Sequence, residues 1–176
     1  LPFIMSKAWI LVGMMGAGKS SIGRTLAEAT NREFIDTDLL IQNRFGRTVS
    51  QVFQIYGEET FRAHETSVLT GLEPGEFVIA TGGGIVTRPE NWVELRRLGL
   101  TCYLDASFET LCERLEVSKK KRPLLETDDW QKRLSDLIAV RKPLYDQADF
   151  SVEVNHNDLG LTAEAVQRAF EERTIE

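Results

Sequence analysis

The chain has 176 residues, of which 42% are hydrophobic and 27% are charged, and this length and composition predict one globular domain over residues 1–176. The formal net charge of -6 provides no general attraction for a nucleic-acid backbone or an anionic membrane, so we expect neither as a partner. The two cysteines form neither a disulfide framework nor a metal-binding spacing, which favours the reducing cytoplasm.

No segment of the sequence is typical of a targeting signal, a membrane span or a subunit interface. The amino terminus lacks the basic start and long apolar centre of a secretion signal, and no apolar run approaches the roughly 20 residues of a membrane span. Met5 is a candidate native start, in which case residues 1–4 would be foreign to the natural chain. A monomer is expected, because no surplus apolar helix face stands out.

Five apolar segments of strand character alternate with segments of helical periodicity. The predicted strands are Ala8–Val12, Glu33–Ile35, Phe77–Ala80, Leu100–Leu104 and Phe150–Val154. A capping box at Thr48–Gln51 and a first-turn proline at Pro89 mark helix starts, and residues 161–172 form a closing amphipathic helix. The alternation predicts an α/β fold with a five-stranded parallel sheet and helices on both faces. Functional residues should then follow the carboxyl ends of strands.

The first predicted strand leads into Gly13-Met-Met-Gly-Ala-Gly-Lys-Ser20, which fits the phosphate-loop pattern. Its glycines let backbone N–H groups converge on phosphate oxygens, and the following helix points its positive end at the same anion. Lys19 would reach the β and γ phosphates, and Ser20 would hold Mg²⁺. A turn that only joins a strand to a helix is the less favoured alternative. The residues expected to contact ATP here are Gly13, Gly16, Ala17, Gly18, Lys19, Ser20 and Ser21.

Two carboxylates, Asp36 and Asp38, end the second predicted strand. Alternation along an extended chain puts both on the same side, near the phosphate loop. Asp36 could order Mg²⁺ through its waters, and Asp38 could accept a proton from a substrate hydroxyl. Both also suit strand ends or helix caps, and Asp38 is a candidate cap of the following helix. The neighbouring phosphate loop favours the catalytic interpretation.

The third predicted strand ends in Thr81-Gly-Gly-Gly84 and carries no carboxylate there, which argues against a motor or a switch. Three glycines at this point would let backbone N–H groups approach a second ligand closely. A flexible loop is the alternative, and the residues alone do not decide between the two.

Two arginines stand at positions that need a partner or a cleft. Arg62 precedes Glu65 by one helical turn, so the Glu65 carboxylate could hold its guanidinium in place. Arg141 follows Leu134 by seven residues and Leu137 by four, which puts it on the apolar stripe of its own helix. Structural ion pairs are the alternative for both arginines.

The basic run Lys119-Lys-Lys-Arg-Pro-Leu-Leu125 suits a mobile lid over residues 117–127 that brings Arg122 to the phosphates. A solvated basic loop and a nucleic-acid patch are the alternatives. His64 and His156 are too few and too far apart to suggest a metal site, so we interpret them as surface or packing residues.

Taken together, these segments resemble the shikimate kinase family in order and spacing, from about Ile10 to Tyr145. The motifs that carry the resemblance are the phosphate loop, Phe34–Asp38, Phe61–Arg62, Thr81–Gly84, Arg122–Leu125 and Arg141–Tyr145. The resemblance implies a P-loop kinase fold with a mobile lid. It also implies phosphorylation of the 3-hydroxyl of shikimate by ATP with Mg²⁺, a step toward chorismate and the aromatic amino acids.

The resemblance also implies roles for single residues. Asp38 would hold the shikimate hydroxyls and act as the base, while Arg62 and Arg141 would grip the carboxylate. Backbone contacts to the ring hydroxyls would come from Gly82, Gly83 and Gly84. Arg122 is similar to a lid arginine that reaches the transferred phosphoryl group, and Arg114 to an arginine lying against adenine. The adenine-contacting loop of the family falls near residues 155–158.

Two other functions compete with this interpretation. A kinase of the same class could act on gluconate or a nucleoside monophosphate, although the paired arginines and the triple glycine argue against it. A nucleotide-binding regulatory module could keep the shape without turnover. The chain has no DNA-reading appendage and keeps Lys19, Asp38 and Arg122, which favours the catalytic interpretation.

Overall fold

Residues 7–118, 122–154 and 158–174 are described by the computed structural model of the chain. The strands are β1 (Ala8–Val12), β2 (Glu33–Asp36), β3 (Phe77–Ala80), β4 (Gly99–Ala106) and β5 (Phe150–Val154). The α-helices are α1 (Lys19–Thr30), α2 (Thr37–Phe45), α3 (Val49–Tyr56), α4 (Glu58–Gly71), α5 (Pro89–Leu98), α6 (Phe108–Val117), α7 (Trp130–Tyr145) and α8 (Leu159–Thr174). Two short 3-10 helices are η1 (Ile85–Thr87) and η2 (Pro123–Leu125).

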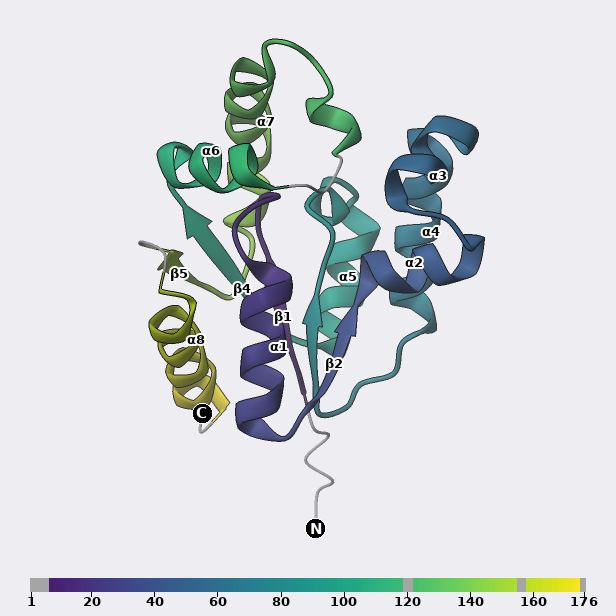
Figure 1. Ribbon diagram of the computed structural model, residues 1–176. Helices are drawn as coiled ribbons and strands as arrows, with labels where there is room; N and C mark the ends of the chain where they lie inside the picture. Colours follow the sequence, from purple (N-terminus) through teal and green to yellow (C-terminus); the bar gives the residue numbers. More distant parts are fainter. Residues whose placement is uncertain (1–6, 119–121, 155–157, 175–176) are drawn as a thin grey trace.

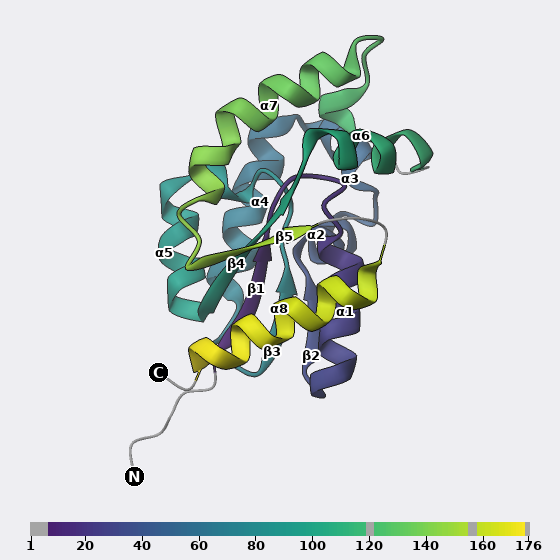
Figure 2. The ribbon, with the colours of Figure 1, turned by 90° about the vertical axis from the view of Figure 1, so that its left-hand side faces the viewer.

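The five strands form one parallel sheet in the order β2-β3-β1-β4-β5. In the central strand β1 all five residues are buried, because a parallel sheet covered on both faces exposes neither side of its middle strands. Figure 1 shows α1 and α8 in front of the sheet, and the quarter turn of Figure 2 shows α5 and α7 on the opposite side. The predicted α/β architecture with helices on both faces is confirmed.

The core has two parts. The larger surrounds the sheet and includes a stacked pair, Trp9 and Phe170, whose ring centroids lie 4.9 Å apart. The smaller is a cluster of side chains from α2, α3 and α4, namely Ile41, Val52, Phe61 and Val68. This second cluster ties the three helices together beside β2, and α2 and α4 carry residues of the predicted substrate site.

Most local signals in the sequence correspond to observed element ends. The capping box is present, with the Thr48 hydroxyl accepting from the N–H of Gln51 and the Gln51 side chain accepting from the N–H of Thr48. Pro89 is the first residue of α5. The strand β4 is longer than predicted, since it begins at Gly99 and continues to Ala106. Within the described residues no helix is long and apolar enough to cross a membrane, and Met5 lies outside them.

The segment after β2 departs from the prediction. The strand ends at Asp36, whose Oδ1 accepts from the backbone N–H groups of Asp38 at 2.9 Å and Leu39 at 3.3 Å. Asp36 is therefore the N-cap of α2, and Asp38 lies in the first helical turn. The interpretations of Asp38 as a cap, and of both carboxylates as alternating on one extended chain, are wrong. A carboxylate that captures the free N–H groups of a helix start ends the strand and begins the helix, here two residues before the predicted cap at Asp38.

Candidate active site

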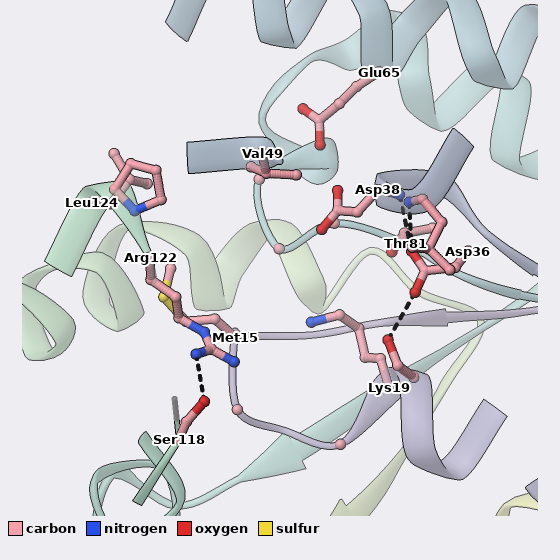
Figure 3. A pocket seen from close by; sticks show the side chains of 18 of the residues that line it. Met15, Lys19, Asp36, Asp38, Val49, Glu65, Thr81, Ser118, Arg122 and Leu124 are labelled. Carbon is pink, nitrogen blue, oxygen red and sulfur yellow. Dashed lines mark hydrogen bonds between the residues drawn. The ribbon is translucent and has the colours of Figure 1, made fainter. Parts of the chain in front are cut away.

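A cavity of about 730 Å³ opens where the carboxyl ends of β1, β2 and β3 meet. Its lining brings together the predicted nucleotide, metal and substrate residues from the phosphate loop, α2, α4, the triple glycine, α6, η2 and α7. Gly13 and Ala17 are the two predicted site residues outside this lining. Figure 3 shows Lys19, Asp38 and Arg122 pointing into this cavity from three different elements.

The charge of the cavity is opposite to that of the whole chain. Its cationic lining residues are Lys19, Arg24, Arg62, Arg114, Arg122 and Arg141, and its carboxylates are Asp36, Asp38 and Glu65. A concave site with surplus positive charge concentrates anions, although the chain as a whole carries a net charge of -6. The cavity therefore suits anionic ligands, such as a nucleoside triphosphate and a carboxylic acid.

The phosphate loop connects β1 to α1 as predicted. Gly16 and Gly18 have φ angles of 84° and 98°, which residues with a side chain rarely adopt. The Lys19 amine donates to the carbonyls of Gly13 at 2.5 Å and Met14 at 2.9 Å, so it is folded over the loop. Arg114, on α6, donates to the carbonyl of Ala17 at 2.9 Å. Burial lowers the pKa of Arg114, and its contact joins α6 to the loop.

Ser20 and Asp36 meet at the start of α1. The Ser20 hydroxyl donates to Asp36 Oδ2 at 3.0 Å, while the other carboxylate oxygen caps α2. Hydroxyl and carboxylate oxygens are the hard ligands that Mg²⁺ prefers, so the predicted pair fits this ion. In the described parts of the chain no group of three or more His, Cys, Asp or Glu side chains could hold a metal by itself. Phosphate oxygens and waters would therefore have to complete the coordination.

The two predicted carboxylate-binding arginines are both buried and both line the cavity. Arg62 on α4 donates to Glu65 Oε1 at 2.7 Å and to Glu58 Oε1 at 3.4 Å, which confirms the predicted contact with Glu65. Arg141 on α7 is 4% exposed, as expected for a charge on an apolar stripe. Their place in the cavity wall gives both guanidinium groups access to a ligand.

Glu65 places a second carboxylate beside Asp38. A Cβ atom built on Gly82 would lie 2.7 Å from Asp38 Oδ1 and 2.8 Å from Glu65 Oε2, so the two oxygens flank the same point. Glu65 is fully buried, and its Oε2 has no hydrogen-bond partner within the described structure. Burial is the largest cause that raises the pKa of Glu65 to about 7; Asp38 raises it further and Arg62 opposes the rise.

The triple glycine is held through its carbonyl groups. Gly82 O accepts from the N–H of Ile85 and Gly83 O from the Tyr145 hydroxyl, while Gly84 O accepts from the N–H and hydroxyl of Thr87. The Gly82 N–H donates to the Thr37 hydroxyl at 3.1 Å. Among the described residues, the N–H groups of Gly83 and Gly84 have no protein acceptor. These two donors are therefore available to a ligand.

Arg122 lines the cavity, but part of the predicted lid is not described. Its guanidinium donates to the Ser118 hydroxyl at 2.9 Å, as Figure 3 shows, and burial lowers its pKa while Asp38 opposes this shift. Lys119–Lys121 of the predicted lid, residues 155–157 of the predicted adenine loop and His156 lie outside the described residues. The other histidine, His64, packs its ring against Phe45 at 4.6 Å, as expected for a packing residue.

Sequence reasoning missed two contributions to this cavity. Glu65 was expected only to hold Arg62, although its spacing of three residues from that arginine already put both on one helix face. Tyr145 was part of a motif with no role assigned, although it follows Arg141 by one turn. Its contact with Gly83 joins residues 62 positions apart, so no local pattern could have indicated it.

Comparison with known sequences connects the chain to one group of enzymes. The family model for shikimate kinase matches residues 15–172. A shikimate kinase of Vibrio parahaemolyticus is 42% identical over 165 residues, which cover 93% of this chain and 95% of that protein. A shikimate kinase of Synechococcus sp. (strain JA-3-3Ab) is 45% identical over 146 residues, which cover 82% of this chain and 77% of that protein.

Solved structures agree with the sequence comparison. The shikimate kinase from Acinetobacter baumannii, in complex with shikimate, matches with a TM-score of 0.91 and 35% identity over 99% of this chain and 98% of that one. A gluconokinase from Sinorhizobium meliloti matches with a TM-score of 0.62 and 18% identity over 97% of each chain, which is a likeness of fold alone. The family match over most of the sequence, the identities of the relatives and the shared fold show that this chain belongs to the shikimate kinase family.

Proposed function

We propose that this protein transfers the γ-phosphoryl group of ATP to the 3-hydroxyl of shikimate, forming shikimate 3-phosphate and ADP. The observation that carries the proposal is one cavity in which a phosphate loop faces two buried arginines and a pair of carboxylates. Relatives named shikimate kinase, at 40% to 48% identity, support the same substrate. The product is consumed on the way to chorismate and the aromatic amino acids.

The substrate half of the cavity matches a small carboxylated polyol. Arg62 and Arg141 would bind the carboxylate, because planar guanidinium groups can donate to it in bidentate fashion. The N–H groups of Gly83 and Gly84, which have no acceptor in the described parts of the protein, would donate to ring hydroxyls. Asp38, in the first turn of α2, would accept from the hydroxyl that reacts.

The nucleotide half would bind ATP through the backbone of the phosphate loop. Lys19 would leave the carbonyls of Gly13 and Met14, which it contacts in this structure, and turn to the β and γ phosphates. Arg114 would lie against the adenine beside the loop, and Arg122 would reach the transferred group. Ser20 and Asp36 would hold Mg²⁺, which supplies charge neutralisation for the phosphates when bound.

The reaction would need little covalent help from the protein. The 3-oxygen of shikimate forms a bond to the γ phosphorus while the bond to the β–γ bridging oxygen breaks, and the hydroxyl proton passes to the Asp38 carboxylate. Phosphoryl transfer depends mainly on alignment and on stabilisation of spread charge, which Lys19 and Arg122 would provide. Closure of the cavity would keep water from taking the phosphoryl group.

The assembly and the compartment are proposed from the exposed side chains and the cysteines. We propose a monomer, since the exposed large hydrophobic residues of the described chain are spread over six helices, with at most two on any one of them. Cys102 and Cys112 are both free thiols, which supports a reducing compartment such as the cytoplasm.

ADP release measured with and without shikimate tests the function. Turnover should require shikimate, and a panel containing gluconate and nucleoside monophosphates should give no comparable rate. Turnover of gluconate or of a monophosphate in place of shikimate would assign the protein to a neighbouring kinase class. Folded protein that binds ATP without turning over any of these acceptors would favour a regulatory module.

A further inference from the structure

Tyr145, the last residue of α7, contacts two loops of the active site, the triple glycine and the phosphate loop. It is 1% exposed, and its hydroxyl donates to the Gly83 carbonyl at 2.6 Å. The same oxygen lies 3.6 Å from Met14 Sδ in the phosphate loop. The ring stacks on Tyr103 with centroids 5.1 Å apart and planes 10° apart. Packing therefore fixes the ring, and the ring holds the hydroxyl at the junction of the two loops.

The direction of the hydrogen bonds at this hydroxyl follows from the chemistry of its partners. A carbonyl oxygen only accepts, so the hydroxyl proton of Tyr145 points to Gly83. The Arg141 guanidinium, one turn earlier on α7, lies close enough to this hydroxyl for its positive charge to oppose the rise in the pKa of Tyr145. Tyr145 thus donates to the Gly83 carbonyl while the positive charge of Arg141 acts on the same hydroxyl. Burial raises the pKa of Tyr145, which keeps the hydroxyl protonated in this role.

Gly83 lies close to both Arg141 and the phosphate loop. The position that a Cβ atom of Gly83 would take is 3.4 Å from Arg141 Nη1 and 3.5 Å from the backbone nitrogen of Met15. Because a peptide unit is planar, holding the Gly83 carbonyl also fixes the direction of the Gly84 N–H on the opposite side. Glycine peptides have wide conformational freedom, so the Tyr145 bond selects one orientation of this peptide.

Resting on the proposed function, we propose that Tyr145 is a positioning residue for shikimate. Its hydroxyl fixes the Gly83–Gly84 peptide beside the Arg141 guanidinium, and so sets the distance between the group that binds the carboxylate and the N–H donors that bind ring hydroxyls. A substrate that carries both features at the correct separation satisfies both contacts in one pose. Tyr145 acts on substrate only through these neighbours.

The test is a double-mutant cycle on steady-state kinetics with shikimate and ATP. Tyr145→Phe keeps the stacked ring and removes only the hydroxyl, and it is measured alone and together with Arg141→Lys. The matched control is Tyr103→Phe, which removes the hydroxyl of the stacked neighbour, a residue outside the cavity lining. Loss of a buried hydrogen bond lowers stability in any role, so the deciding readout is the KM for shikimate against the KM for ATP.

We expect Tyr145→Phe to raise the KM for shikimate about tenfold and to change the KM for ATP less than about twofold, because one desolvated contact to a charged group is misplaced. In the Arg141→Lys background, Tyr145→Phe should raise the KM for shikimate less than about threefold, since lysine has no planar guanidinium group to align with the substrate. Tyr103→Phe should leave both constants near the parent values.

The positioning role would be overturned if Tyr145→Phe raised the KM for shikimate by the same factor in the parent and Arg141→Lys backgrounds. Equal rises in the KM for shikimate and the KM for ATP would overturn it too. A parent enzyme that turns over no shikimate would instead overturn the proposed function on which it rests. If Tyr145→Phe is partly unfolded at the assay temperature, the measurements are repeated in trimethylamine N-oxide, which favours the folded state. Circular dichroism then verifies that the folded variant is the species measured.

Discussion

Replacing Glu65 by Gln tests the electrostatics of the carboxylate pair, because it removes a buried ionisable group and keeps its shape. Glu65 is fully buried and accepts from Arg62 at 2.7 Å. A Gln side chain can still accept through its carbonyl oxygen, and it carries no charge at any pH. Any difference in pH dependence between Glu65→Gln and the parent therefore reports the ionisation of this one group.

The magnitude follows from the raised pKa of Glu65. Its pKa is about 7 in the folded protein against 4.5 for an exposed glutamate. Between these values the folded protein keeps a proton that the unfolded chain has lost, so the free energy of unfolding decreases as pH rises. The contribution is fully present below pH 4.5 and is lost as pH passes 7. Between pH 5 and 8 it amounts to about 2 to 3 kcal/mol.

Urea unfolding followed by circular dichroism at pH 5, 6, 7 and 8 measures this contribution. The stability of Glu65→Gln relative to the parent should rise by about 2 to 3 kcal/mol from pH 5 to pH 8, because only the parent loses the contribution. Glu58→Gln is the matched control, since Glu58 contacts the same arginine at 3.4 Å with half of its side chain exposed. Parallel pH profiles for Glu65→Gln and the parent would refute the raised pKa.

Three further substitutions test the assignments in the cavity. Asp38→Asn should cost less than about 1 kcal/mol of stability, because it is not the helix cap, and should lower kcat by about 10² to 10⁴; a normal melting curve with turnover within a few-fold of the parent would remove its catalytic role. Lys19→Ala should abolish turnover. Arg141→Ala should chiefly raise the KM for shikimate, by a factor that corresponds to a loss of about 2 to 4 kcal/mol of binding free energy. An unchanged KM for shikimate would make Arg141 a structural residue. Gly84→Ala should displace the Arg62 guanidinium, against which the new methyl group would collide, and raise the KM for shikimate about tenfold while circular dichroism stays unchanged; parent-like kinetics would show that Arg62 can move without loss of binding.

The sequence alone was enough to predict the features that depend on neighbours along the chain. The phosphate loop follows β1 within a few residues, the capping box spans Thr48 to Gln51, and Arg62 reaches Glu65 across one helical turn. Each of these arrangements is set by backbone geometry over a short segment, so residue type and spacing suffice. The five strands were equally predictable, because parallel strands covered on both faces are short apolar runs.

Only the tertiary structure decided how these segments meet. Asp36, and not Asp38, is the helix cap because of where β2 ends against β3. The positions of the Asp36 and Asp38 carboxylates in the cavity both depend on this helix start. Glu65 Oε2 and Asp38 Oδ1 flank Gly82 because α2 and α4 pack on one small core beside the sheet. Tyr145 reaches Gly83 across 62 positions because α7 returns over the strand ends. Such contacts arise from the packing of whole elements, and the free energy of that packing is spread over a core that no short stretch of sequence contains.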